Sequence, residues 1–392
     1  MQVQSTVPLR GTKPLKISRA AVTMTKIPVI RAHKMAIGTT LHQENVILRL
    51  YTTDGLEGLG EAPHMVGISL KGESPYTVLE MLRHRLLPAI FGRSPLDIEG
   101  IQQAMDAAVP WNLRAKSAVN LAAYDLAGKA LGVPVHTLMG GKVRDAIPLS
   151  WSIPITEYDK GAREAAEMVA RGWRIIKVKV GRPDPDDDVE MVRVIRDAVG
   201  PRVSVRVDAN QAYSLKAAIR VARKLERHDV TFFEQPVAWW DLDGLAEVSR
   251  ATELPIMADE SCTTPIDAVE IVKRRAAQIV SIYVCSPGGI LNSKKVATVA
   301  AAGGITGYVG GALESVIGAA AGLHFAAATP SVTYGCELGG QFLLADDIAQ
   351  VPLVFKDGAL QVPEGPGLGI AINEETVRKY KIGEFTLDAG AA

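Results

Sequence analysis

Hydrophobic and polar residues follow one pattern before Arg144 and another after it. In residues 17–60 apolar and β-branched residues are frequent. The run 45–51 (NVILRLY) is followed by Thr52-Thr53-Asp54-Gly55, a typical turn sequence, and then by a second run at 56–61. Two such runs joined by a turn predict a β-hairpin in an antiparallel sheet.

Residues 75–140 have the periodicity of helices. Ser74-Pro75 is a typical helix start, and the alanine-rich segment 116–131 is followed by the breaker Gly132-Val133-Pro134. Because strands followed by helices are typical of an α+β domain, we assign such a domain to residues 1–145.

After Arg144 short β-branched strands alternate with helix-like stretches. This alternation predicts parallel βαβ units, and eight of them fit a closed (β/α) barrel over residues 146–350. An open doubly wound sheet is the alternative, but no GxGxxG sequence follows the first strand. The predicted strands are 149–153, 175–180, 203–208, 231–234, 255–259, 279–284, 305–309 and 332–336.

Two segments need a separate interpretation. Residues 296–313 form a segment without charged side chains. The length of this segment is near the lower limit for a membrane-spanning helix. The segment is rich in glycine and alanine, so we expect a buried helix, a turn and a buried strand instead. Residues 351–392, rich in proline and glycine before a Gly-Ala-Ala end, read as a return segment that packs on the first domain.

Basic and acidic residues balance, with 43 Lys and Arg against 43 Asp and Glu. Nucleic-acid binding needs a surplus of positive charge and a disordered acidic segment a surplus of negative charge, so neither is expected. The three cysteines lack CxxC spacing, which argues against disulfides or a zinc site. Residues 1–20 do not resemble a signal peptide. We expect a cytoplasmic protein without nucleic-acid or membrane partners.

Charged residues stand where an active site is expected, at the carboxyl ends of the barrel strands. Lys177 and Lys179 lie on one face of the second strand, which is unfavourable inside an apolar barrel unless the pair has a function. The third, fourth and fifth strands end at Asp208, Glu234 and Asp259, each about one βα unit after the last.

Three carboxylates with open positions suit Mg²⁺ or Mn²⁺, whereas zinc prefers His or Cys, and no histidine lies at these strand ends. Each lysine lowers the pKa of the other, so one can serve as a base or, when protonated, as an acid. A cation opposite it would hold a substrate carboxylate and stabilise an enediolate. The pattern favours proton chemistry beside a carboxylate over surface salt bridges.

Four motifs resemble the enolase superfamily, in its muconate lactonizing enzyme subgroup: Lys177-Val178-Lys179, Asp208-Ala209-Asn210, Glu234-Gln235-Pro236 and Asp259-Glu260-Ser261. Further stretches look like the muconate cycloisomerases, at 31–36, 116–117, 138–141, 310–314 and 366–369. The resemblance covers nearly the whole chain.

The resemblance implies a modified (β/α)7β TIM-type barrel under an α+β capping domain built from the N-terminal region and the C-terminal tail. Lys179 would be the acid/base, with Lys177 tuning it and Asn210 beside the metal ligands. Muconate cycloisomerases interconvert cis,cis-muconate and muconolactone, and members of the family commonly form homo-octamers. The implied ligands of Mg²⁺ or Mn²⁺ are Asp208, Glu234 and Asp259.

The sixth strand departs from the family pattern KxxKxGG. Its sequence, IYVCSPGG over 282–289, places Tyr283 and Ser286 where the lysines would stand. A racemase needs a proton relay on each face of the α-carbon, and a phenol, with a pKa of about 10, serves only if that pKa is lowered. Tyr283 is therefore either a catalytic residue or an aromatic side chain that fills space.

One lysine suffices for a syn cycloisomerisation or for a β-elimination on one face. We therefore expect a cycloisomerase of a muconate-like carboxylate, with a dehydratase of a hydroxy acid as the alternative. An N-acyl amino acid racemase or dipeptide epimerase ranks third, since residues 334–337 lack the DxD of the epimerases. A non-enzymatic barrel ranks last, because it predicts a broken metal triad.

Other polar residues are candidates to complete the pocket. Residues 63–74 resemble the mobile loop that closes over substrate, but lack the tyrosine that muconate enzymes carry near Leu70, which leaves the substrate open. The candidates are Glu260 beside Asp259, Cys285 on the face of Tyr283, Glu314 and Glu337 at the ends of the seventh and eighth strands, and His64 in the loop.

Overall fold

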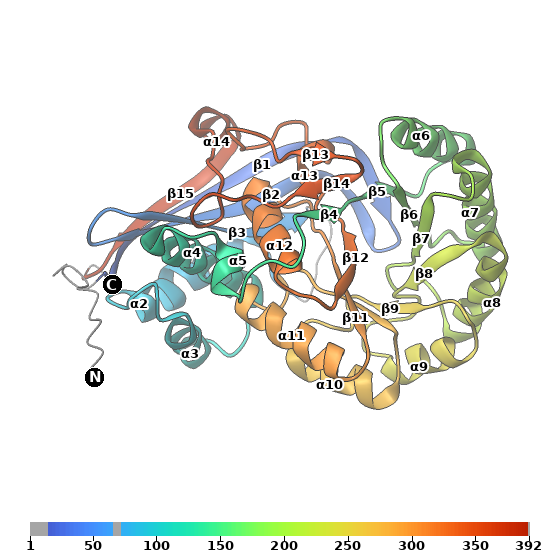
Figure 1. Ribbon diagram of the computed structural model, residues 1–392, viewed down its shortest axis with the longest axis horizontal. Helices are drawn as coiled ribbons and strands as arrows, with labels where there is room; N and C mark the ends of the chain where they lie inside the picture. The colour runs from blue at the N-terminus through green and yellow to red at the C-terminus, as the bar shows by residue number, and fades with distance from the viewer. Residues whose placement is uncertain (1–14, 66–71, 391–392) are drawn as a thin grey trace, which may run out of the picture.

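The structure is a computed structural model, which describes residues 15–65 and 72–390. A ring of strands and helices forms a barrel, and a long antiparallel sheet with its own helices lies against it (Figure 1). The predicted barrel with an α+β cap is therefore confirmed.

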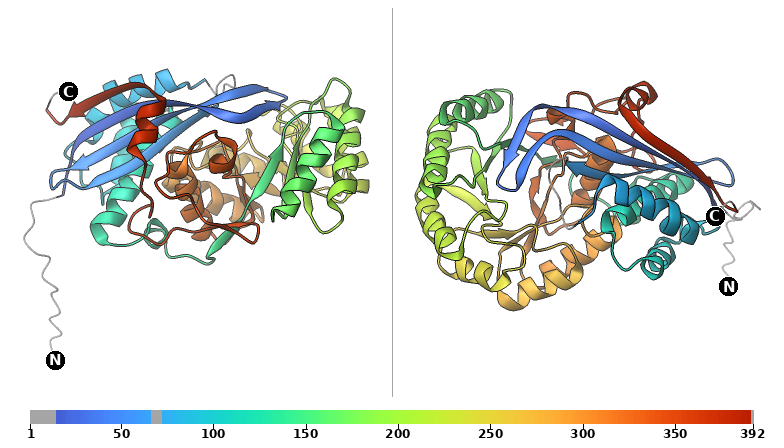
Figure 2. Two further views of the ribbon diagram at one scale, coloured as in Figure 1. Left: turned by 90° about the horizontal axis from the view of Figure 1, so that it is seen from above. Right: turned by 180° about the vertical axis from the view of Figure 1, so that it is seen from behind.

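The cap sheet has the strand order β15-β1-β2-β3, so the C-terminal strand joins the first one. β15 pairs antiparallel with β1 from Asp388 opposite Arg19 to Lys381 opposite Thr25 (Figure 2). The predicted hairpin is confirmed as β2 and β3. The bounds are β1 Ile17–Met35, β2 Gly38–Thr52, β3 Glu57–Met65 and β15 Lys381–Asp388.

Helices follow the cap strands as predicted. Ser74 and Thr77 form a capping box at the first of them, and Gly132, with a φ of 69°, ends the longest. These helices are α1 Pro75–Met81, the π-helical η1 Leu82–Leu86, α2 Leu87–Ile90, α3 Ile98–Ala108, α4 Leu113–Leu131 and α5 Val135–Leu138.

The barrel sheet has eight parallel strands in sequential order, β5 to β12. A parallel bridge between Leu149 and Cys336 joins the first strand region to the last, so the sheet closes. The strands are β5 Ser150–Ile153, β6 Ile175–Lys179, β7 Ser204–Asp208, β8 Val230–Glu234, β9 Ile256–Ala258, β10 Ile279–Ser281, β11 Thr306–Val309 and β12 Val332–Cys336.

Helices connect successive barrel strands and cover the outside of the ring (Figure 2). They are α6 Tyr158–Ala170, α7 Pro185–Val199, α8 Leu215–Leu225 with the 3₁₀ turn η2 Glu226–His228, α9 Leu242–Arg250, α10 Pro265–Arg274, α11 Ile290–Ala302 and α12 Val316–Ala327. The remaining elements are β4 Ala146–Pro148, α13 Gly340–Leu343, β13 Phe355–Lys356, β14 Ala359–Gln361 and α14 Glu374–Tyr380.

The uncharged segment 296–313 forms the end of α11, a turn and β11, as predicted. Val296, Ala297 and Ala300 are buried, so small apolar residues here pack a helix onto the barrel. Across residues 15–65 and 72–390, no helix is long and apolar enough to cross a membrane.

Glu61 joins the cap to the barrel. The side chain comes from β3 and is fully buried. Its carboxylate accepts hydrogen bonds from the backbone N–H groups of Ser315 (3.0 Å) and Gly318 (2.7 Å) and from the Ser315 hydroxyl (2.9 Å). These donors belong to the first turn of α12, whose N–H groups lack partners within the helix. Burial nevertheless raises the pKa of Glu61 to about 7.

A Glu61→Gln variant tests this link. Because the pKa of Glu61 is raised on folding, the wild-type carboxyl group contributes stability below pH about 4.5 that declines as the pH rises to about 7. We expect the free energy of unfolding of wild type minus that of the variant to fall across this window, measured by urea titration. A difference that grows with pH would contradict this account.

Candidate active site

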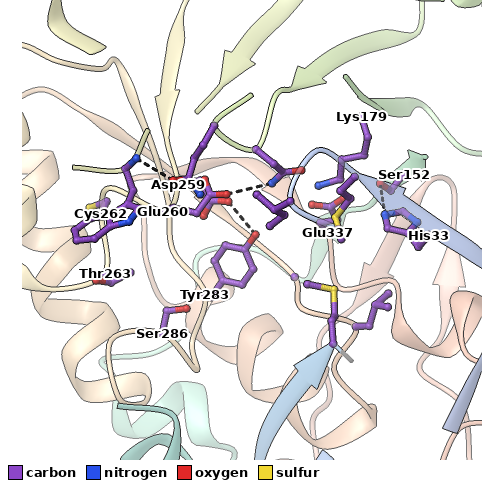
Figure 3. Close-up of a pocket in the computed structure, with 18 of the residues that line it drawn as sticks. His33, Ser152, Lys179, Asp259, Glu260, Cys262, Thr263, Tyr283, Ser286 and Glu337 are labelled. Atoms are coloured by element: carbon purple, nitrogen blue, oxygen red, sulfur yellow. Dashed lines mark hydrogen bonds between the residues drawn. The ribbon is translucent and has the colours of Figure 1, made fainter. Parts of the chain in front are cut away.

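A cavity of about 270 Å³ lies at the carboxyl ends of the barrel strands, under the cap (Figure 3). Both parts of the protein contribute to its wall. From the cap come His33, Met35, Ile37, Met65, Glu73, Leu113 and Arg114. The charged and amide residues from the barrel are Lys179, Asn210, Gln211, Asp259, Glu260 and Glu337.

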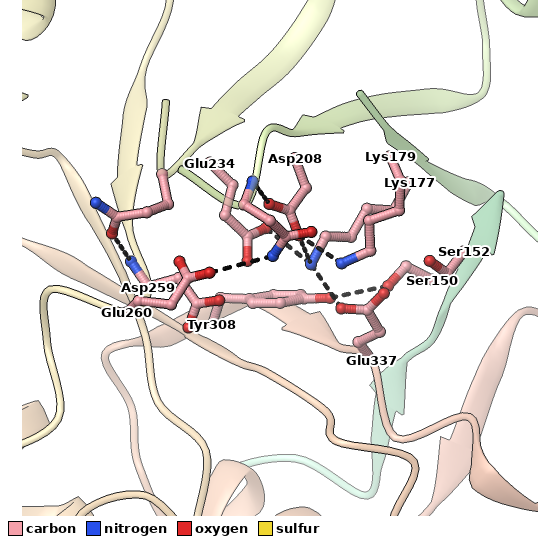
Figure 4. A network of polar contacts seen from close by, with 12 residues as sticks. Ser150, Ser152, Lys177, Lys179, Asp208, Glu234, Asp259, Glu260, Tyr308 and Glu337 are labelled. Carbon is pink, nitrogen blue, oxygen red and sulfur yellow. Dashed lines mark hydrogen bonds and ion pairs between the residues drawn. The ribbon is translucent and has the colours of Figure 1, made fainter. Parts of the chain in front are cut away.

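Lys177 and Lys179 both point into the barrel from β6, as their spacing predicts (Figure 4). Nζ of Lys177 lies 2.6 Å from Glu337 Oε2, 2.8 Å from Glu234 Oε2 and 3.1 Å from Asp208 Oδ2. Nζ of Lys179 lies 2.6 Å from Asp208 Oδ2. The two lysines therefore share one carboxylate.

Burial acts to lower the pKa of both lysines, but their carboxylate neighbours outweigh it. The pKa of Lys177 stands well above its ordinary value because of Glu234, Glu337 and Asp208. Asp208 raises the pKa of Lys179, while Lys177 lowers it. The repulsion between the lysines predicted from sequence is thus present, but in this arrangement both remain charged.

The predicted carboxylates stand on neighbouring strands. Lys179 pairs with Asp208 in the β6–β7 ladder, and Asp208 pairs with Glu234 in the β7–β8 ladder. Burial acts to raise the pKa of Asp208, but the lysines dominate and lower it to about 2. Burial and Asp208 raise the pKa of Glu234 well above its ordinary value, and burial and Glu260 do the same for Asp259. The raised pKa values of Glu234 and Asp259 therefore reflect, besides burial, repulsion between neighbouring carboxylates at the strand ends.

Several oxygens at this point lack hydrogen-bond donors among the described residues. Both carboxylate oxygens of Glu234, Oε2 of Glu260 and Oδ1 of Asn210 are buried and accept no hydrogen bond. Lys177 is close enough to Glu234 for an ion pair, but it does not meet the geometry of a hydrogen bond. Repelling carboxylates and unpaired hard oxygens fit a divalent cation.

No group of three acidic, histidine or cysteine side chains in the described parts of the chain is arranged, as it stands, to hold a metal ion. The ammonium group of Lys177 lies near both Asp208 and Glu234 and offers them the positive charge that a cation would. Binding a cation would therefore require these side chains to turn.

Tyr283 lines the cavity from just beyond β10, the sixth barrel strand, whereas Lys179 ends the second strand. In a ring of eight strands these positions face each other across the barrel. The hydroxyl of Tyr283 donates to Asp259 Oδ2 at 3.1 Å. Its ring packs against Gly310, where a Cβ would lie 2.2 Å from Cε2. Burial and Asp259 raise the pKa of Tyr283 well above its ordinary value, so it is held as a neutral phenol.

Three further predicted residues lie at the cavity. Glu337 lines it and pairs with Lys177. Asn210 donates from its backbone N–H to Asp208 Oδ1 at 2.9 Å and from its side chain to Glu260 Oε1 at 3.3 Å. Asn210 and Glu260 both line the cavity, so the end of β7 is tied to the residue that follows Asp259.

Cys285 and Glu314, two of the candidates to complete the pocket, do not line this cavity. They lie beside Glu61 at a separate small cavity between cap and barrel. The sequence suggested that Cys285 shares a face with Tyr283, but β10 ends at Ser281, so strand alternation does not extend to either residue. Burial raises the pKa of Cys285 to about 12, which keeps the thiol protonated.

His64 is also absent from the cavity wall. It lies in strand β3, and the next residue, Met65, lines the cavity in its place, because successive side chains of a strand point to opposite faces. Of the predicted loop 63–74, residues 66–71 lie outside the described residues.

The sequence reasoning missed several wall residues. Arg114 stands at the start of α4, two residues before the Lys116-Ser117 motif. His33 lies within the stretch 31–36 that carries the family resemblance. Burial and Lys179 lower the pKa of His33 well below its ordinary value, so it is neutral. The other missed polar or aromatic residues are Ser152, Glu73, Gln211, Trp239 and Thr263.

Sequence comparisons match both parts of the chain. Residues 17–140 match the mandelate racemase / muconate lactonizing enzyme N-terminal domain, and residues 160–376 match the enolase C-terminal domain-like family. A chloromuconate cycloisomerase of Cupriavidus necator is 35% identical over 93% of this chain and 99% of its own length. Muconate cycloisomerase 1 of Rhodococcus opacus is 33% identical, with 93% and 98% covered.

Solved structures give the same family. The muconate lactonizing enzyme of Pseudomonas fluorescens, complexed with muconolactone, has a TM-score of 0.92 and 33% identity over 94% of this chain and all of its own. The N-succinyl Arg/Lys racemase of Bacillus cereus has a TM-score of 0.91 and 30% identity, with 95% and 100% covered. The chain therefore belongs to the enolase superfamily, in its mandelate racemase / muconate lactonizing enzyme group.

Proposed function

We propose that this protein is a divalent-metal-dependent cycloisomerase that interconverts a cis,cis-muconate-like dicarboxylate and its lactone. The observation that carries the proposal is the asymmetry of the cavity, which has a lysine, Lys179, on one side and a neutral phenol, Tyr283, on the other. The names of the similar proteins, muconate and chloromuconate cycloisomerases, support the substrate class.

Asp208, Glu234 and Asp259 would hold Mg²⁺ or Mn²⁺. The bound cation supplies positive charge that holds one substrate carboxylate and favours negative charge at the carbon beside it. Lys177 stays buried among the same carboxylates and keeps them in place when the cation is absent. Its charge also acts to lower the pKa of Lys179, against the carboxylates that raise that pKa and keep Lys179 protonated.

Lys179 is the acid in the direction of ring closure. An oxygen of the distal carboxylate adds to the diene, and its C–O bond forms as a π-electron pair moves to the carbon beside the other carboxylate. That carbon takes a proton from Nζ of Lys179, which solvent restores. In the reverse direction the neutral amine removes the same proton. Tyr283 donates to Asp259 and holds that carboxylate without exchanging a proton with the substrate.

A racemase is the second candidate, because an N-succinyl Arg/Lys racemase is among the structurally similar proteins. It would need a base on the side of Tyr283, where burial and Asp259 hold the phenol neutral. A dehydratase needs only Lys179 and differs from the cycloisomerase in releasing water.

The family resemblance also supports the proposal that this protein forms a homo-oligomer. Exposed aromatic and aliphatic side chains such as Trp111, Trp240 and Ile266 would be covered in a homo-oligomer.

Replacement of Lys179 tests the acid. We expect Lys179→Ala to lower kcat for cis,cis-muconate by about 10²–10⁴-fold, the usual contribution of a general acid. Turnover is followed by the loss of ultraviolet absorbance of muconate with Mg²⁺ or Mn²⁺ present. Lys160→Ala, at an exposed lysine of α6 outside the cavity, is the control and should keep full activity. Full activity of Lys179→Ala would refute the mechanism.

Replacement of Glu234 tests the cation site. Glu234→Gln should weaken Mn²⁺ binding about tenfold or more, measured by electron paramagnetic resonance of free Mn²⁺ without substrate. Glu190→Gln, at an exposed carboxylate of α7, should bind as wild type does. If both variants bind Mn²⁺ equally well, the cation is held elsewhere.

Tyr283→Phe separates a positioning role from a catalytic one. Loss of the hydroxyl removes its hydrogen bond to Asp259 but no proton that the substrate needs, so kcat should fall by less than about tenfold. The same assay measures it. Loss of all activity would assign proton transfer to the phenol and restore the racemase as a candidate.

A further inference from the structure

Arg114 brings a second basic side chain to the cavity. It stands at the start of α4 in the cap, and Arg114 and Lys179 are the arginine and lysine residues among the described residues of the wall. Arg114 is only 4% exposed. Its Nη1 donates to the carbonyl oxygen of Pro63. Because a guanidinium group has five N–H donors, this contact leaves most of them for another acceptor.

No carboxylate of the described residues lies within ion-pair distance of Arg114. The nearby carboxylate of Glu73 instead accepts the backbone N–H groups of Arg114 (3.0 Å) and Ala115 (3.4 Å) at the start of α4. Glu314 lines the separate small cavity beside Glu61, where burial raises its pKa to about 7 although the charge of Arg114 acts against this. Lys179, by contrast, is paired with Asp208.

A buried guanidinium without a counter-charge is unfavourable, so its place in the cavity wall indicates that an anion completes it. The planar group matches the two oxygens of a carboxylate. The remaining carboxylates of the wall lie at the strand ends of the barrel, beside Lys177 and Lys179, and not in the cap.

We propose that Arg114 binds the second carboxylate of the substrate, the one distant from the strand-end carboxylates, and thereby selects dicarboxylates over monocarboxylates. The assignment rests on the proposed function, in which the distal carboxylate closes the lactone ring. Arg114 orients this group from the cap, whereas Lys179 performs proton transfer from the barrel. In this arrangement the cap selects the substrate and the barrel carries out proton transfer.

Binding of an unreactive dicarboxylate tests the proposal without turnover. Hexanedioate and its monoamide have the same length and differ in one charge. Titration calorimetry with Mg²⁺ present should show wild type binding hexanedioate about tenfold or more tightly than the monoamide. Arg114→Met should bind the two equally, and Arg114→Lys should keep part of the difference.

Arg144→Met is the control. This partly buried arginine donates to carbonyl oxygens of Ala326 and Thr329 outside the cavity, so its loss should lower stability and keep the preference. Wild type without preference for hexanedioate, or Arg114→Met that retains it, would overturn the proposal. If Arg114→Met does not fold, the proposal is tested by the preference of wild type for hexanedioate and by the reduced preference expected for Arg114→Lys.

Turnover of muconate is measured separately, so that the two proposals can fail separately. A preference that depends on Arg114 in an enzyme inactive on muconate would keep the anion site and reject the cycloisomerase. Turnover of muconate, with a KM that Arg114→Met leaves unchanged, would keep the cycloisomerase and reject the anion site.

Discussion

The ammonium group of Lys177 is the interaction on which the mouth of the barrel depends. It lies within 3.1 Å of carboxylates from the ends of three strands, β7, β8 and β12, and it is completely buried. Without that charge, several buried acids would face one another in a medium that screens their repulsion poorly. Lys177 therefore allows neighbouring strands to end in carboxylates, which in the function we propose would hold a divalent cation.

The same arrangement makes the cavity one-sided. Lys179 shares the carboxylate of Asp208 with Lys177 and remains charged, whereas across the barrel Tyr283 remains a neutral phenol bonded to Asp259. A charged amine can give a proton, and this phenol, whose pKa is raised, cannot readily lose one. In the function we propose, proton transfer therefore occurs on a single face of the substrate.

The residues at the strand ends could be predicted from sequence because two local regularities determine their positions. The βα repeat fixes where Asp208, Glu234 and Asp259 stand, and alternation along a strand puts Lys177 and Lys179 on one face. Prediction failed where those regularities stop. Cys285 lies beyond the last residue of β10, and a loop was expected where β3 continues to Met65. Arg114 was missed because a cap helix reaches the barrel only through tertiary packing.

Deuterium transfer from solvent tests the central claim of one-sided proton chemistry most directly. Muconate is turned over in D₂O, and the lactone is analysed by NMR for deuterium at the carbon beside the free carboxylate. The account predicts one deuteron, on one face of that carbon, and its loss in Lys179→Ala. Deuterium on both faces, or one deuteron that persists without Lys179, would contradict it.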